Sequence, residues 1–272
     1  MMSLLRSSAL TGCLVVAALP AAAQSFDCVI TPAVTVNVSA PVGGLLSEVN
    51  VRRGDLVEKG QVIARLDTDI EETTVALMQE RAASQSELDV QRARLALAES
   101  RMKRVTTLVE RKITTAEELE EAEASVDVAT GELAMAEMRN RIATLELRRA
   151  TEIVKQRTIT SPINGVVQSR ALFEGEYTDQ DAEIVTIAQL DPLHVEAFLP
   201  VEMFTKLSLD MPVQITPRAP LEGTFEGRIQ VIDRIFDAAS GTFGVQVVLP
   251  NADLGLPAGH RCEVTFPNTA QN

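Results

Sequence analysis

The sequence predicts an elongated α+β fold: an antiparallel α-helical coiled-coil hairpin inserted in a split β-sandwich and followed by a β-barrel domain. Three observations predict it. No Pro occurs between Pro41 and Pro162, and Gly131 is the only Gly between Gly60 and Gly165, which favours long helices in that stretch. Apolar residues recur there at heptad spacing. The flanking segments are rich in Val, Ile and Gly and repeat each other.

Composition excludes several classes of function. The 272 residues carry 25 Lys+Arg against 38 Asp+Glu, a net charge of −13. Because phosphate backbones are bound by Lys and Arg, no nucleic-acid partner is expected. Two His and three Cys leave little material for a dense metal site. His194 and His260 belong to no recognisable nucleophile motif. We therefore expect no enzyme activity, no catalytic residue, no metal and no cofactor.

Residues 1–23 predict a secretory signal peptide. An arginine precedes an apolar run at 9–19, and three alanines ending at Ala23 form a cleavage site. The run is about half as long as a membrane-spanning helix, so we expect a periplasmic protein after cleavage near Ala23. A Leu-Thr-Gly-Cys sequence ending at Cys13 is similar to a lipobox, and an inner-membrane lipid anchor there is the less favoured alternative.

The mature chain keeps two cysteines, Cys28 and Cys262, near its two ends. In an oxidising compartment two thiols often pair, and this pair would connect the first strand to the last. The alternative is that both are small buried apolar residues. The sequence leaves both possibilities open, because it does not measure the distance between them.

Segments 40–67 and 158–189 are predicted to be the two halves of one β-sandwich. Aligning Pro41 with Pro162 also aligns later glycine, acidic and apolar positions. The further matched pairs are Gly44 with Gly165, Gly54 with Gly175, Asp55 with Glu176, Ile63 with Ile184, and Leu66 with Ile187. Each half is too short to bury a core alone, so the intervening hairpin must return the chain to its starting point.

Residues 68–157 are predicted to form that hairpin from two helices, 68–110 and 115–157. Each begins with a capping box, Thr68 to Glu71 and Thr115 to Glu118. At a rise of 1.5 Å per residue, each helix would be about 60 Å long.

The second helix has the clearer coiled-coil seam. Its heptad positions are Leu119, Val126, Leu133, Asn140, Leu147 and Val154, alternating with Ala122, Ala129, Ala136, Ala143 and Ala150. Alanine lets the partner helix approach closely, and the polar Asn140 would set the register. The first helix repeats Leu88, Leu95, Met102 and Val109, with Leu77, Ala98 and Val105 between them. Its seam is expected to be looser near Arg81 and Ser84. Met78, Met102, Met135 and Met138 are expected to pack on these helices.

The C-terminal segment 190–267 is predicted to be a β-barrel domain, followed by a tail at 268–272. Strand-like runs separated by Pro and Gly occur at 193–199, 213–216, 227–232, 242–249 and 261–266. Residues 201–207 are consistent with one short helix.

Two motifs carry a family resemblance. Residues 54–67 look like the first half of a biotinyl/lipoyl domain and residues 161–167 like its second half. No Met-Lys or Ala-Lys tip joins them, which argues against a carrier domain. A lipoyl-like domain split by a coiled-coil hairpin resembles the periplasmic adaptor, or membrane fusion protein, family of tripartite efflux systems (resistance-nodulation-division type, HlyD-like). The resemblance covers about 40–267 and implies that 24–39 adds the first barrel strand, which would bring Cys28 near Cys262.

The resemblance also implies docking residues at the hairpin turn. Adaptors that dock onto a TolC-like outer-membrane channel carry Arg, Leu, Ser and Leu-Asp there. This chain has Arg104, Leu108, Thr115, Leu119 and Glu120, with Thr in place of Ser and Glu in place of Asp. An alternative is that Leu108 and Leu119 only close the coiled coil and that Thr115 only caps a helix.

The function implied by the resemblance is that of a periplasmic adaptor. It would link an inner-membrane efflux transporter to an outer-membrane TolC-like channel for export of small molecules, and would assemble as a homo-oligomeric ring. Three alternatives stay open: an adaptor of an ABC-type exporter or type I secretion system, a structural coiled-coil protein with no channel partner, and a lipoyl-type carrier subunit. The exported substrate is not readable from the sequence.

Overall fold

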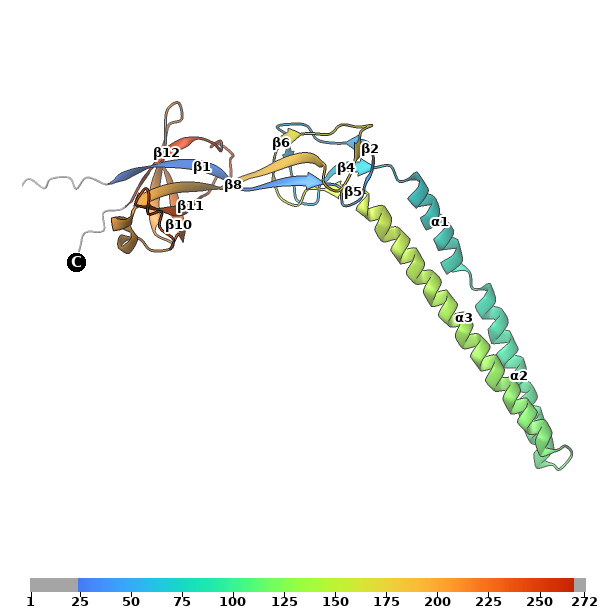
Figure 1. Cartoon of the computed structure of the whole chain (residues 1–272). Coiled ribbons are helices and arrows are strands. Elements are labelled where there is room, and N and C mark those ends of the chain that lie inside the picture. The colour runs from blue at the N-terminus through green and yellow to red at the C-terminus, as the bar shows by residue number, and fades with distance from the viewer. Residues whose placement is uncertain (1–23, 267–272) are drawn as a thin grey trace, which may run out of the picture. The chain divides into compact units, whose positions relative to one another are not determined.

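The computed structural model describes residues 24–266, which divide into two compact units (Figure 1). Of the described residues, the barrel unit contains 24–34 and 189–266, and the hairpin unit contains Thr35–Ala188. The predicted signal peptide, Cys13 and the tail at 268–272 lie outside the described residues. Within residues 24–266, no helix has the length and apolar character that a membrane span requires.

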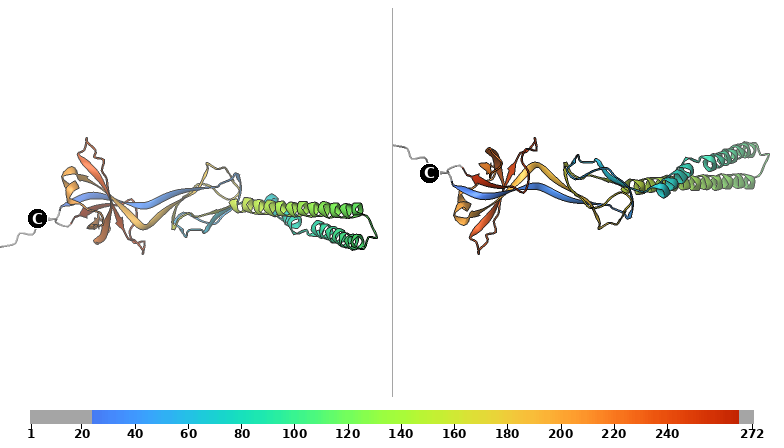
Figure 2. Two further views of the ribbon diagram at one scale, coloured as in Figure 1. Left: turned by 90° about the horizontal axis from the view of Figure 1, so that it is seen from below. Right: turned by 90° about the horizontal axis from the view of Figure 1, so that it is seen from above.

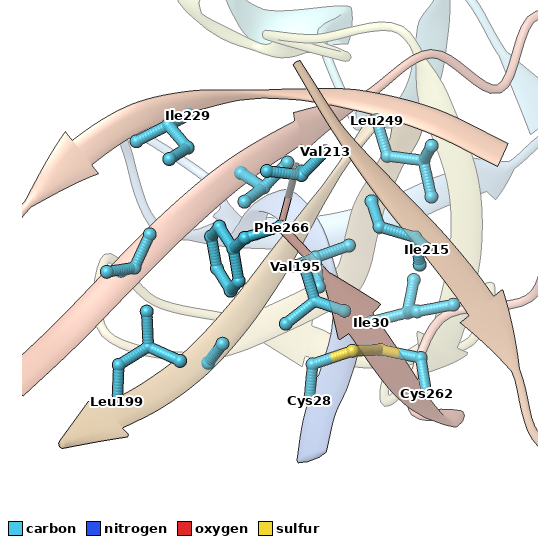
Figure 3. Close-up of a cluster of buried hydrophobic side chains, with 14 of the residues drawn as sticks. Cys28, Ile30, Val195, Leu199, Val213, Ile215, Ile229, Leu249, Cys262 and Phe266 are labelled. Carbon is cyan, nitrogen blue, oxygen red and sulfur yellow. A yellow bond between two sulfur atoms is a disulfide. The ribbon is translucent and has the colours of Figure 1, made fainter. Parts of the chain in front are cut away.

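The barrel unit is a closed ring of six strands. The strands follow one another in the order β1, β12, β9, β10, β11 and β8, and β8 pairs again with β1. Their bounds are Ser25–Ser39, Arg261–Thr265, Pro212–Pro217, Phe225–Ile232, Thr242–Leu249 and Glu183–Pro200. A short 3-10 helix, η1 (Val201–Lys206), follows β8. Alternating inward side chains fill the ring (Figure 3), so the predicted β-barrel is confirmed.

A disulfide joins Cys28 and Cys262 inside the barrel unit. The two residues lie directly opposite each other on β1 and β12, with Cα atoms 4.9 Å apart. Both side chains are buried in the apolar cluster (Figure 3). The structure therefore has a covalent link between the first and last strands of the barrel, rather than two separate buried thiols.

The hairpin unit contains the β-sandwich. One sheet has the order β5, β4, β2, β7, while β3 and β6 extend from the N-terminal part of β8. The bounds are Gly44–Val49 for β2, Leu56–Val57 for β3, Val62–Leu66 for β4, Thr158–Thr160 for β5, Gly165–Arg170 for β6 and Tyr177–Thr178 for β7. Strands of the two sequence halves pair with each other three times, β2 with β7, β4 with β5 and β3 with β6. The sandwich is therefore built from both repeats together.

Three helices form the hairpin: α1 (Asp69–Ala83), α2 (Ser86–Glu110) and α3 (Ala116–Gln156). The predicted continuous helix over 68–110 is therefore wrong, because it is interrupted between α1 and α2 (Figure 2). Ser84 has an extended backbone, with φ −68° and ψ 115°.

The interruption changes which side chains of the first arm face α3. Leu77, predicted for the seam, is half exposed, whereas Val75, Met78 and Ala82 are more buried. Continuing the spacing of α1 would place Gln85 and Asp89 in the seam. After the break, Leu88 is buried there instead, at 6% exposure. The break thus exchanges two polar residues for an apolar one.

Asn140 on α3 lies opposite this interruption. Its Nδ2 donates to the carbonyl oxygens of Ala82 at 3.3 Å and Ser84 at 3.5 Å. Carbonyls at a helix end lack intrahelical donors. Asn140, the one polar residue of the α3 seam, therefore supplies a hydrogen-bond donor to the carbonyls at the end of α1. This contact specifies the register of the two arms at the break.

We predict that Asn140→Asp destabilises the α1 end. Aspartate keeps the shape but presents only acceptors to the two carbonyls, and loss of such hydrogen bonds costs about 1 kcal/mol. Amide hydrogen exchange in residues 75–84 should become faster by roughly fivefold or more. Thr144→Ala, an exposed change one turn further along α3, is the matched control. Unchanged exchange in Asn140→Asp would contradict the assigned role.

The two predicted capping boxes differ in outcome. At the start of α3, the Thr115 hydroxyl accepts from the backbone N–H of Glu118 at 3.3 Å, as predicted. The Glu118 carboxylate, which was predicted to reach back to the cap residue, accepts from the Thr114 hydroxyl instead. At the start of α1, Thr68 makes no capping hydrogen bond to the backbone, and Glu71 forms an ion pair with Arg157 at the end of α3. The prediction of a capping box at the start of α1 is therefore wrong, because Glu71 pairs with Arg157, which lies 86 residues away along the chain.

Candidate functional site

The hairpin tip (residues 104–120) joins the end of α2 to the start of α3 and contains all five predicted docking residues. Lys112 has a positive φ of 58°. Its N–H donates to the Val109 carbonyl at 2.8 Å, and the N–H of Ile113 donates to the Leu108 carbonyl at 2.9 Å. This pair of bonds is a Schellman motif, which closes the C-terminus of a helix. The turn is therefore a defined structure.

The predicted docking residues are divided between exposed and packed positions. Arg104, Thr115 and Glu120 are exposed, and Leu108 keeps 38% of its surface exposed. Leu119 is half-buried at the first position of the α3 seam. The structure therefore places four of the five at the surface, whereas Leu119 mainly closes the coiled coil.

Local contacts orient these side chains. The guanidinium of Arg104 donates to the Ser100 hydroxyl at 3.0 Å, which holds it along α2. Thr115 accepts from the α3 backbone, and Arg101 and Glu121 form an ion pair of 3.6 Å between the arms. The hydroxyl of Thr115 is thus used in capping while the side chain stays exposed.

Ile113, which the sequence patterns did not indicate, is 66% exposed in the turn. The Schellman bonds bring its backbone to that of Leu108, so two exposed apolar residues lie at the end of the hairpin. Arg111 and Lys112 precede it and are also exposed. An isoleucine between two helix ends was a usable signal, because turns are normally polar. The left-handed backbone of Lys112 could not be predicted from its residue type, because Gly or Asn usually occupies that position.

We predict that Lys112→Gly stabilises the hairpin by about 1 kcal/mol, because glycine adopts a positive φ without the steric cost of a Cβ. The helical circular dichroism signal of the hairpin should be lost at a higher temperature than in the wild-type protein. Lys112→Ala is the control, since it removes the same charge and keeps the Cβ. Equal stabilisation by both variants would show that the charge, and not the backbone, was responsible.

Both histidines lie in the barrel unit. The His260 Nε2 lies 2.6 Å from the backbone oxygen of Arg218, and His194 lies in β8 opposite Val248 of β11. Among residues 24–266, no group of three or more His, Cys, Asp or Glu side chains is arranged to hold a metal ion. The exposed groups of the hairpin tip suit contact with another protein.

Comparison with known proteins agrees with this architecture. Residues 34–189 match a family model described as the CzcB-like, barrel-sandwich hybrid domain. The chain is 25% identical over 230 residues to the nodulation protein NolF of Rhizobium meliloti. This alignment covers 85% of this chain and 59% of NolF. It is 23% identical over 244 residues to the nickel-cobalt-cadmium resistance protein NccB of Alcaligenes xylosoxydans xylosoxydans, covering 86% and 54% respectively. The chain thus spans somewhat more than half the length of these relatives.

Solved structures share the fold. MacA from Actinobacillus actinomycetemcomitans superposes with a TM-score of 0.76 at 22% identity, covering 90% of this chain and 78% of MacA. The membrane fusion protein Spr0693 from Streptococcus pneumoniae gives a TM-score of 0.57 at 14% identity, covering 91% and 100%. Since the family model matches more than half of the chain, the predicted resemblance is confirmed: this protein belongs to the membrane fusion proteins with a CzcB-like barrel-sandwich hybrid domain.

Proposed function

We propose that this protein is a periplasmic adaptor of a tripartite efflux system, linking an inner-membrane transporter to an outer-membrane TolC-like channel. The observation that carries the proposal is the hairpin tip, where exposed Leu108 and Ile113 lie among the charged residues Arg104 and Glu120. Exposed apolar side chains surrounded by charge are typical of a protein-binding surface. The tip would bind the end of the channel by coiled-coil packing.

The proposed adaptor acts by assembly and carries out no catalysis. Copies of the chain would form a homo-oligomeric ring in the periplasm, against a transporter of the resistance-nodulation-division or ABC type. The relative NccB is a nickel-cobalt-cadmium resistance protein. Transition-metal ions are accordingly one class of small cargo to test for this system, alongside organic compounds.

Site-specific photo-crosslinking in the native host tests the channel contact. A photoreactive residue at Ile113 or Thr115 of the full-length protein should crosslink to an outer-membrane protein, and one at the exposed Glu137 in the middle of α3 should not. Changing Leu108 and Ile113 together to Asp should reduce the Thr115 crosslink about tenfold or more, because apolar contacts at an interface centre often contribute over 1.4 kcal/mol. An exported, folded protein that crosslinks to no outer-membrane partner from either position would overturn the proposal.

A further inference from the structure

The disulfide between Cys28 and Cys262 lies at the place where the barrel closes. Strand β12 fills the space between β1 and β9 and pairs with both. Among residues 24–266 it is the last strand along the chain, so it joins the barrel after the other five strands have been made. Without β12, strands β1 and β9 are the two open edges of the barrel sheet. Cys28 therefore lies on the edge that receives the closing strand.

Closure of the barrel buries both sulfur atoms. Cys28 is 4% exposed and Cys262 is 0% exposed, and both belong to the apolar cluster (Figure 3). Beside them, the N–H of Ile30 donates to the His260 carbonyl at 2.8 Å, and the N–H of Gly259 donates to the Ile30 carbonyl at 2.7 Å. Thiol–disulfide exchange with another protein requires access to a sulfur atom. Such an exchange must therefore take place before β12 has docked.

The two cysteines become available at different times. They are separated by 234 positions, and the predicted signal peptide at 1–23 directs export of the chain from its N-terminal end. Cys28 thus enters the oxidising compartment first and stays at an open sheet edge until β12 arrives. An accessible thiol forms the reactive thiolate more readily than a thiol buried among apolar groups. Cys28 is therefore the first of the two to react.

The number of cysteines limits the products that oxidation can give. The sequence contains three cysteines, and cleavage near Ala23 removes Cys13. Two cysteines allow one pairing within the chain, so no isomerisation between alternative pairings is needed. The remaining wrong product is a dimer that joins Cys28 of two copies. An oxidant that stays bound to Cys28 until Cys262 arrives would prevent that dimer.

We infer that this chain is a substrate of a thiol–disulfide oxidoreductase, a protein with a reactive Cys-X-X-Cys disulfide, which acts on Cys28 before β12 docks. The Cys28 thiolate attacks one sulfur of the enzyme disulfide and forms a mixed disulfide, while the other enzyme sulfur leaves as a thiolate. The Cys262 thiolate then attacks the Sγ of Cys28, and the first enzyme sulfur leaves. The chain loses two electrons, and the enzyme becomes a dithiol that takes up the two thiol protons.

Docking of β12 delivers the second thiol to the mixed disulfide. In the closed barrel Cys262 lies directly opposite Cys28 in the antiparallel pairing of β12 with β1. A slip by one residue would turn the Cys262 side chain to the outer face of the barrel. Release of the enzyme therefore requires β12 in its correct register. This inference goes beyond the proposed adaptor function and depends only on export of the chain.

Removing the second cysteine should trap the mixed disulfide. In full-length Cys262→Ser, produced in the native host, Cys28 should stay joined to the enzyme because no thiol releases it. Cells are quenched with acid, free thiols are alkylated, and the protein is detected on a non-reducing gel. We expect a larger species that a reductant abolishes and in which mass spectrometry identifies a Cys-X-X-Cys protein. The variant does not need to fold, because trapping precedes closure of the barrel.

Two matched variants test the order of the steps. Cys28→Ser should trap less enzyme than Cys262→Ser, because Cys262 enters with β12 and is then buried. The double variant Cys28→Ser/Cys262→Ser should trap none. Equal or stronger trapping at Cys262 would overturn the assigned order. Finding only a homodimer of this chain, only a small-thiol adduct, or no adduct at Cys28 would overturn the enzyme as the oxidant.

The same experiment separates this inference from the proposed function. An exported chain that crosslinks to an outer-membrane protein at its hairpin tip but traps no oxidoreductase contradicts the inference alone. A chain that keeps residues 1–23 and both thiols in the host contradicts the periplasmic location, and the inference falls with it.

Reduction of the purified native protein tests whether closure blocks access to the sulfur atoms. Dithiothreitol should reduce the disulfide at least about tenfold more slowly in buffer than in urea that unfolds the barrel, because attack then waits for the pairing of β1 with β12 to open. Free thiols are counted by alkylation and intact mass. Reduction of oxidised glutathione in the same two solutions corrects for the effect of urea on the chemistry. Equal rates for the protein would show that oxidation need not precede closure and would overturn the inference.

Discussion

Replacing Cys28 and Cys262 together with alanine is expected to lower the free energy of unfolding of the barrel unit by about 3–5 kcal/mol. The bridge joins residues separated by 234 positions, and a crosslink over a long loop removes much of the conformational entropy of the unfolded chain. Both sulfur atoms also lie in the apolar core, so their removal leaves space that the core must absorb.

Calorimetry of the full chain, with hydrogen exchange in β1 and β12, measures this effect. Exchange in these strands should accelerate strongly, while the inner seam of the hairpin stays protected. The wild-type protein treated with a reductant is the control, since it loses the bond and keeps both side chains. If the double alanine variant unfolds at the wild-type temperature, the disulfide contributes nothing to the barrel unit and the prediction fails.

Gly165→Ala is expected to destabilise the β-sandwich by about 3 kcal/mol. A Cβ at this position would lie 2.4 Å from the carbonyl oxygen of Ala188 and 2.9 Å from its carbonyl carbon. Both are backbone atoms of β8, so relief requires β6 and β8 to move apart at the place where Val166 pairs with Ala188.

Gly131→Ala is the matched control for that prediction. It makes the same chemical change in α3, where a Cβ meets nothing within 4 Å, and alanine is favoured over glycine in a helix by about 1 kcal/mol. Hydrogen exchange in β6 should therefore accelerate in Gly165→Ala, while the helix around residue 131 becomes better protected in Gly131→Ala. Equal effects of the two changes on the sandwich would contradict the steric explanation.

The repeat of the two sandwich halves could be detected in the sequence, because corresponding positions of the two halves need the same residue types to form the same backbone structure. Ile63 and Ile184 are both fully buried, as are Leu66 and Ile187. The glycine pair Gly44 and Gly165 has a common cause, since an added Cβ at either position would lie close to another group. Gly54 and Gly175 instead share a positive φ, of 93° and 85°. At Gly44 the nearest group is the guanidinium of Arg157, 2.9 Å from an added Cβ. The period and the glycines are local signals, which is why alignment of the sequence with itself detected them.

At the hairpin tip, the sequence indicated where the turn lies but not its conformation. Thr115 and Glu118 mark the start of α3 by residue type and spacing, and the structure has that cap. Lys112 adopts a left-handed conformation that its side chain disfavours. The closing hydrogen bonds of the turn compensate for it, and no single-residue preference predicts them. The same bonds bring Ile113 next to Leu108.

The sequence by itself determined the order of strands, helices and strands, the inner seam of α3 and the halves of the sandwich, because periodicity and breaker residues act locally. Only the tertiary structure decided the break between α1 and α2, the failed cap at Thr68 and the pairing of Cys28 with Cys262. Each depends on a group far away in the chain: Asn140 for the break, Arg157 for the cap and the paired strands β1 and β12 for the disulfide. Long-range contacts of this kind form only when folding brings the segments together. They then override the conformational preferences of the individual residues.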